Sequence, residues 1–136
     1  MKQLTKCISF AFVFLLSGCQ QETAILVSGK ITLDGEPLST ATVTFLADGH
    51  EDAAVFRTDE KGVYPADASI RQPLQPGKYT VRISTSDEGD MEADPPLPPV
   101  KERVPSKYNF DSTLTASVDA NNLVFDFDLD SKGRMD

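Results

Sequence analysis

Apolar residues recur at every second position in several short segments, and after the first 18 residues no convincing stretch shows helical spacing. The segments 25–33, 41–45 and 79–83 alternate in this way. In the segment 123–129, Leu123, Phe125, Phe127 and Leu129 alternate with Val124, Asp126 and Asp128. A period of two places apolar side chains on one face of a pleated strand. The sequence therefore predicts half-buried β-strands.

Short turns are expected between these segments. Asp34-Gly35 is a strong hairpin signal, and residues 59–62 and Pro76-Gly77 have the composition of turns. Several short strands separated by Gly, Pro and Asp turns are typical of an antiparallel β-sandwich. We therefore predict an all-β fold, an antiparallel β-sandwich of seven strands.

Three further strands complete this expectation. They are predicted at 53–58, at 63–64, where a proline follows and ends the strand or confines it to a sheet edge, and at 114–118. We expect the last of these to form a hairpin with 123–129 across a turn at 119–122.

The segment 87–107 interrupts the pattern. It contains six acidic residues and two proline pairs. Proline removes backbone donors and favours an extended, solvated chain. We predict a long crossover loop between two strands of the sandwich. It is either a tolerated insertion that lacks the apolar residues needed to order it, which we favour, or a binding loop.

The start of the chain has the order of an export signal. Lys2 and Lys6 precede an apolar run from Ile8 to Leu16, and the small residues Ser17-Gly18 follow. The run is too short for a spanning helix, which needs about 20 residues.

Cys19 directly follows the small residues, so the start resembles a bacterial lipoprotein signal. In that family the cysteine is lipidated, with palmitate among its acyl groups, and becomes the first residue of the mature chain. The resemblance implies a signal peptide at 1–18, lipidation of Cys19 and a short tether at 19–24. The rival interpretation is a plain secretory signal with an incidental cysteine.

Charge limits the partners of the remaining chain. The signal holds two of the 13 basic residues and none of the 21 acidic ones, so the mature chain would carry a formal charge of −10. This charge disfavours nucleic acid, which needs a basic surface. It also disfavours a domain that lies flat on anionic lipid. No disulfide is expected, because Cys7 would leave with the signal and Cys19 would carry lipid.

Catalytic and metal-binding patterns are missing from the sequence. A zinc peptidase needs two or three histidines and a carboxylate, but His50 is the single histidine of the chain. No Gly-x-Ser-x-Gly turn accompanies it, and the acidic groups do not match a calcium loop. We therefore expect no enzymatic activity, no cofactor and no metal site, with His50 on a solvated loop. Lys107-Tyr108-Asn109 either contacts a ligand or is structural, and we favour packing of Tyr108 under the 87–107 loop.

Three segments resemble carboxypeptidase regulatory-like domains and lie in the order of that family. They are 27–43, which includes Asp34-Gly35, then 58–64, and 76–83. The remainder is similar to small bacterial lipoproteins built on that domain. The resemblance implies a transthyretin-like (prealbumin-like) sandwich over 25–130, a tail at 131–136 and a non-catalytic module.

Two function classes remain. The first is a membrane-anchored lipoprotein of the bacterial cell envelope, a structural or interaction module that contacts an envelope protein or polysaccharide. Gln20 after the cysteine resembles outer-membrane sorting, with the domain facing the periplasm or the cell surface. The second is a small-ligand or carbohydrate-binding domain. We favour the first, because the chain has no tryptophan and most of its Phe and Tyr residues fall at core spacing.

Overall fold

The computed structural model describes residues 18, 24–47, 51–70 and 72–132, apart from the side chains of residues 52 and 53. Cys19 and His50 lie outside the described residues. The same holds for nearly all of the predicted signal peptide and tether and for most of the tail, so these predictions stay as they are.

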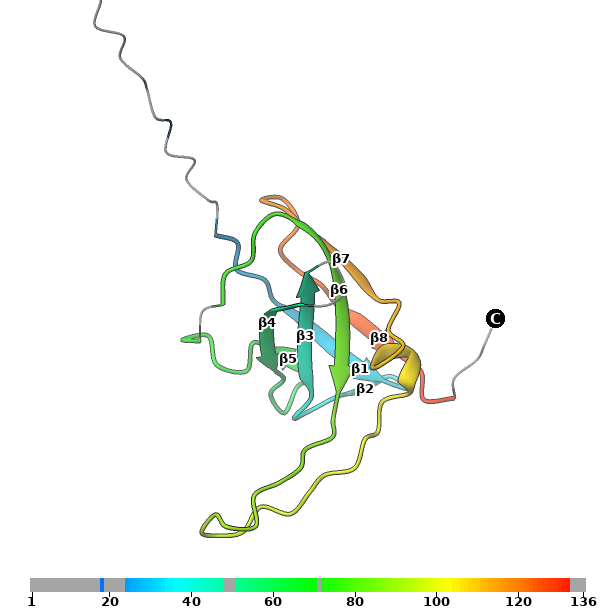
Figure 1. Cartoon of the computed structure of the whole chain (residues 1–136). Coiled ribbons are helices and arrows are strands. Elements are labelled where there is room, and N and C mark those ends of the chain that lie inside the picture. Colours follow the sequence, from blue (N-terminus) through cyan, green and yellow to red (C-terminus); the bar gives the residue numbers. More distant parts are fainter. Residues whose placement is uncertain (1–17, 19–23, 48–50, 71, 133–136) are drawn as a thin grey trace, which may run out of the picture.

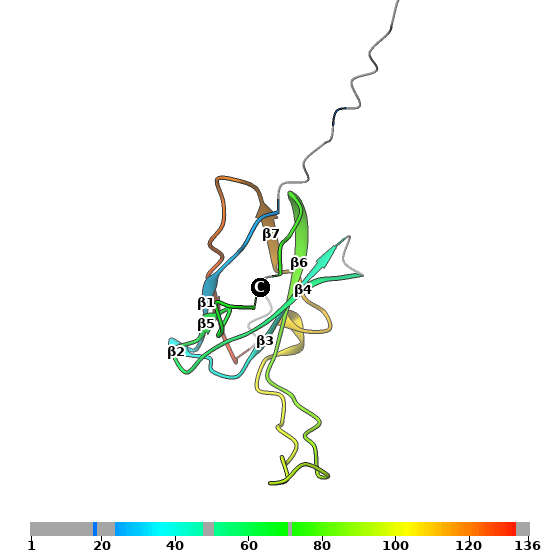
Figure 2. The ribbon, with the colours of Figure 1, turned by 90° about the vertical axis from the view of Figure 1, so that its left-hand side faces the viewer.

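The described residues form two mostly antiparallel sheets and no α-helix (Figure 1). The first sheet contains β1 (Gly29–Leu33), β2 (Glu36–Pro37), β5 (Val63–Tyr64) and β8 (Phe127–Leu129). The second has the order β4-β3-β6-β7 and contains β3 (Thr42–Ala47), β4 (Glu51–Arg57), β6 (Gly77–Ser84) and β7 (Thr115–Val118). A short 3-10 turn, η1 (Ser106–Tyr108), precedes β7. The prediction of an all-β fold is confirmed, and two facing sheets are consistent with a β-sandwich (Figure 2).

The core lies between the two sheets. Phe45 of β3 is fully buried at its centre. Its ring centroid lies 5.8 Å from that of Phe56 and 6.2 Å from that of Tyr79, and across the interface 6.3 Å from that of Tyr64. Such tilted and edge-to-face contacts stabilise a core beyond the burial of the rings. Most of the alternating residues predicted from the sequence therefore meet in one core, including those of 25–31, 41–45 and 79–83, but Leu123 does not.

The predicted turn at Asp34-Gly35 is confirmed. Leu33 pairs with Glu36 across it, and both turn residues have positive φ, 53° and 84°. Positive φ at both central positions matches the twist of the flanking strands. The Asp34 carboxylate also accepts the backbone N–H of Ser131 at 3.0 Å, which ties the chain after β8 to this turn.

The predicted hairpin between 114–118 and 123–129 is wrong. β7 pairs with β6, whereas β8 pairs in parallel with β1 in the other sheet. β8 is also shorter than the predicted strand 123–129, because it covers only Phe127–Leu129. Leu123, predicted on its apolar face, is 41% exposed. Alternation assigns side chains to faces but carries no information about the neighbouring strand, so it fits either pairing.

The segment 87–107 is not a crossover, because β6 and β7 are antiparallel neighbours in one sheet. It is a long connection that leaves the end of β6 and returns to the same sheet. Figures 1 and 2 show it extending from the lower end of the molecule.

The N-terminal part of the described chain joins the two sheets at the end of the molecule opposite the long connection (Figure 1). Ile25 and Leu74 exchange two backbone hydrogen bonds, at 2.9 and 2.8 Å, just before β6 begins. We call this the entry end. Because β6 has eight residues, about 25 Å separates the entry end from the start of the long connection.

Candidate interaction site

The long connection forms a two-armed projection, which we define as residues 87–100. Asp87 and Val100 exchange backbone hydrogen bonds at 3.1 and 2.8 Å, and Asp90 and Leu97 exchange two at 2.8 Å. The chain between these pairs is therefore held as a narrow ribbon rather than as an open loop. The tip, residues 91–96, extends away from both sheets (Figure 1).

Gly89 allows the two arms to approach. Its φ is +72°, and a Cβ atom there would lie 2.4 Å from the carbonyl oxygen of Leu97. Real Cβ atoms do not approach a backbone oxygen so closely, so any other residue would push the arms apart. The Asp87 carboxylate accepts the Gly89 N–H at 2.8 Å and holds this turn.

Glu102 fastens the base of the projection to the end of β6. Its carboxylate accepts hydrogen bonds from the Ser84 hydroxyl, the N–H and hydroxyl of Thr85, the Val104 N–H and the Asn109 amide. Burial raises the pKa of Glu102, but these donors outweigh that effect and lower it to about 2. The carboxylate stays charged at neutral pH and positions the outgoing and returning chains together.

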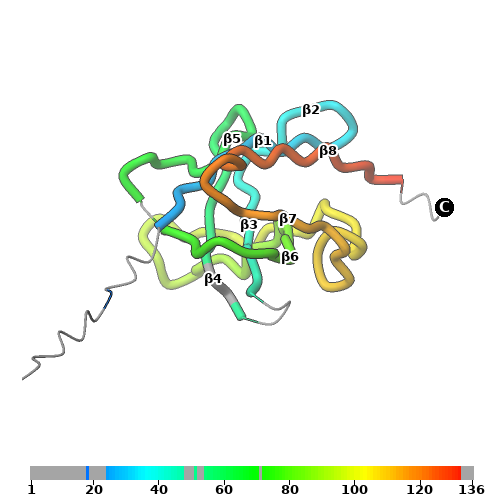
Figure 3. The backbone as a smooth tube through the Cα atoms, turned by 90° about the horizontal axis from the view of Figure 1, so that it is seen from above, coloured from blue at the N-terminus to red at the C-terminus, as the bar shows by residue number. Residues whose placement is uncertain are grey.

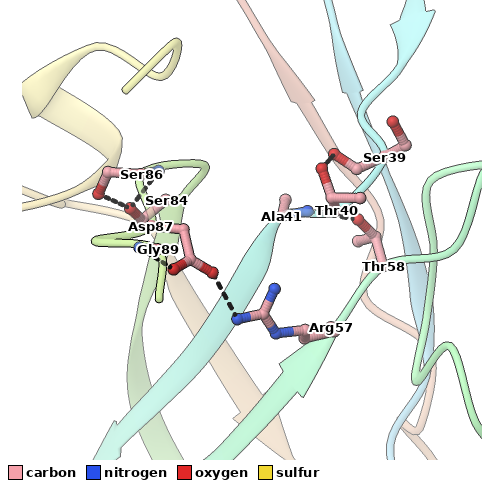
Figure 4. Close-up of polar contacts among 9 residues, drawn as sticks. All are labelled: Ser39, Thr40, Ala41, Arg57, Thr58, Ser84, Ser86, Asp87 and Gly89. Atoms are coloured by element: carbon pink, nitrogen blue, oxygen red, sulfur yellow. Dashed lines mark hydrogen bonds and ion pairs between the residues drawn. The ribbon is translucent and has the colours of Figure 1, made fainter. Parts of the chain in front are cut away.

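A hollow of about 430 Å³ lies between the projection and the end of the second sheet. Its lining is Thr40, Arg57, Thr85, Asp87, Gly89, Asp90, Leu97, Pro98 and Val100. Arg57 at the end of β4 reaches across it, and its Nη2 lies 3.2 Å from Oδ2 of Asp87 (Figure 4). The Gly89 N–H and then the Arg57 guanidinium lower the pKa of Asp87. Both side chains are exposed, so this ion pair contributes little to stability.

The body wall of the hollow is held by a buried threonine. The Thr58 hydroxyl accepts the Ala41 N–H at 2.9 Å and donates to the Leu38 carbonyl at 2.7 Å. Between them Thr40 has a positive φ of 55°, and its hydroxyl donates to the Ser39 carbonyl at 2.7 Å (Figure 4). These hydrogen bonds lie within the body, and the Ser39 carbonyl also accepts a hydrogen bond from Nη2 of Arg103, in the chain that returns from the projection, at 3.2 Å.

The hollow therefore combines apolar side chains from one arm with hydroxyls, and one ion pair across it joins Arg57 of the body to Asp87 of the projection. Such a surface suits non-covalent contact with a partner. Among the residues that the structure describes, no group of three or more His, Cys, Asp or Glu residues could hold a metal ion.

The residues considered from the sequence have mainly structural contacts. Tyr108 packs against the core, and its hydroxyl accepts the Asp130 N–H at 3.3 Å. Asn109 is buried against Glu102. Asp126 accepts the Lys30 N–H at 2.8 Å on the outer face of the first sheet.

Sequence reasoning missed the Arg57–Asp87 pair, the two groups that face each other across the hollow. They are 30 positions apart, and no local pattern links them. The available signal was weak, because Arg57 lies near the end of the predicted strand 53–58 but Asp87 only begins the predicted loop 87–107.

No family model matches this chain, and no curated protein matches it. In the described part of the chain, no helix has the length and apolar character needed to cross a membrane.

Proposed function

We propose that this protein is a non-catalytic interaction module of the bacterial cell envelope. It is held to a membrane by lipid on Cys19 and contacts an envelope protein through the projection and the hollow beside it. Its fold is that of a carboxypeptidase regulatory-like domain, a transthyretin-like sandwich. The observation that carries the proposal is the location of the entry end and the projection at opposite ends of β6 (Figures 1 and 2).

This arrangement suits a tethered module. The five residues 20–24 span at most about 18 Å, so the entry end stays close to the membrane. The projection then begins about 25 Å farther out and extends beyond the body. A partner on the outer side would meet the projection first.

The exposed surface of the projection fits a protein partner. Met91, Leu97 and Val100 are exposed apolar side chains, at 67%, 57% and 48%. The same segment also carries five carboxylates, those of Asp87, Glu88, Asp90, Glu92 and Asp94. A surface that combines apolar side chains with carboxylates favours a partner that offers both apolar and basic groups.

A small-ligand or carbohydrate-binding domain is the second candidate. The hollow of about 430 Å³ has the size of a ligand pocket. Its lining includes no aromatic ring, however, and a flat aromatic platform is the usual surface for a sugar. The interaction module therefore remains the better proposal.

Site-specific photocrosslinking in growing cells tests the proposal. A photoreactive residue at Leu97 should form a discrete adduct with one protein. The same residue at Val63, an exposed position on the first sheet, is the control and should not form it. Equal adducts at both positions, or none at Leu97, would exclude the projection as the contact surface.

A further inference from the structure

Four exposed apolar side chains gather at the entry end. They are Leu26, Ile70, Leu123 and Val124, which are 44%, 54%, 41% and 61% exposed. We call them the entry patch. Single exposed apolar residues are ordinary on protein surfaces, but a continuous group marks a contact.

The entry patch is continuous through Ser28. Leu26, Ser28 and Ile70 line one hollow of about 260 Å³. The Ser28 N–H donates to the Leu123 carbonyl at 3.0 Å, and Ser28 forms a bridge with Val124. Viewed from above in Figure 3, the 24–28 segment lies between the 66–70 segment and the turn that leads to Val124.

The strand pattern explains why one of these side chains, Leu26, faces outward. Ile25 and Val27 are buried, so Leu26 between them lies on the outer face of the first sheet. Farther along that face the surface becomes polar, because the Thr32 hydroxyl donates to the Asp128 carboxylate at 2.6 Å. Beyond the entry patch, this face also carries Val63, which is 38% exposed and pairs with Lys30.

The strongly acidic segment lies at the other end of the molecule, although two single carboxylates, Asp67 beside Ile70 and Asp119 in the turn before Leu123, also lie close to the entry patch. The carboxylates of the projection lie beyond the far end of β6, about 25 Å from the entry end. That distance exceeds the Debye length of about 8–10 Å at physiological salt. The acidity of the projection therefore does not keep the entry end away from a lipid surface.

We propose that the entry patch rests in the interfacial layer of the membrane that carries the lipid on Cys19. This inference depends on the proposed lipid attachment. The tether ends at Ala24, two residues before Leu26, so the patch is always within reach of the bilayer. Attachment supplies the high local concentration that lets a small apolar surface bind lipid. The contact fixes the orientation of the body and directs the projection away from the membrane.

Depth-dependent quenching tests the contact. Lipidated protein with a single introduced cysteine is labelled with bimane and reconstituted into phosphatidylcholine vesicles that contain brominated acyl chains. Cys19 would not react, because its thiol carries the lipid. Labels at Leu26→Cys and Val124→Cys should lose about half of their fluorescence, because side chains in an interfacial contact lie about 5–10 Å deep.

The matched control is Leu97→Cys, an exposed apolar position on the projection, and its label should not be quenched. Protein that floats with the vesicles but shows no quenching at Leu26 and Val124 would overturn the contact and leave the lipid attachment intact. Protein that does not float would overturn both. If Leu26→Cys does not fold, the more exposed Val124 position decides the test alone.

Discussion

At the residue scale, Phe45 is the side chain whose removal should cost the most stability. It is fully buried and meets rings from both sheets. We expect Phe45→Ala to lower the free energy of unfolding by about 3–5 kcal/mol, from lost transfer energy and the cavity that remains. Urea denaturation followed by circular dichroism measures this change.

A phenylalanine on the surface supplies the matched control. Phe110 is 80% exposed, so Phe110→Ala should change the free energy of unfolding by less than about 0.5 kcal/mol. Similar losses for the two variants would mean that the core is not centred on Phe45.

Glu102 should make stability depend on acid pH. Its pKa is about 2 in the folded protein against an ordinary value of 4.5. Because the folded value is depressed, the stabilisation is complete above the unfolded pKa and is lost as pH falls from about 4.5 towards 2. Glu102→Gln should flatten this part of the pH dependence, measured as urea midpoints at pH 6 and pH 3.

Other carboxylates limit how far the profile can flatten. Hydrogen bonds from Ser131, Ser69 and Gly89 lower the pKa values of Asp34, Asp67 and Asp87, respectively. Some loss of stability in acid should therefore remain in Glu102→Gln. Glu60→Gln, on the exposed turn before β5, is the control and should keep the profile of the unaltered protein. If the Glu102→Gln profile were identical to that of the control, the hydrogen bonds to Glu102 would not be the source of this pH dependence.

At the element scale, a side-chain amide covers the open edge of β4. The Val55 N–H donates to Oε1 of Gln72 at 2.8 Å, and Nε2 of Gln72 donates to the Val55 carbonyl at 2.7 Å. Gln72 thus occupies the place of a neighbouring strand. An edge strand with free N–H and C=O groups is a template for pairing with another chain.

Gln72→Ala should therefore increase self-association, because it leaves the Val55 backbone groups open at the edge. Analytical ultracentrifugation over a range of protein concentrations measures it. Gln72→Glu keeps an acceptor and adds a charge that opposes pairing, so it should remain closer to the unaltered protein. Unchanged association of Gln72→Ala would show that the amide is not needed to protect this edge.

At the scale of the whole molecule, Cys19 should decide where the protein is found. Cys19→Ser removes the thiol that would carry lipid, so it should release the domain from the membrane or leave it unprocessed. Membrane fractionation combined with labelled palmitate measures this. A mature-sized Cys19→Ser protein that remains in the membrane fraction would contradict attachment through this residue.

Local sterics determined what the sequence could predict alone. Alternating residues of one strand, such as Val43 and Phe45, had to share a face, because successive side chains of a strand point to opposite sides. Asp34-Gly35 had to turn the chain, because both residues accept positive φ. These features depend on neighbours within a few positions, so they could be predicted without knowledge of the fold.

Only the tertiary structure decided which strands pair and which distant segments of the chain come into contact. β8 is parallel to β1, although its residues also fit a hairpin with β7. The contact between Arg57 and Asp87, the Glu102 network and the entry patch join segments from 17 to nearly 100 positions apart. Such contacts depend on the packing of the two sheets as a whole, and a local pattern carries no record of them.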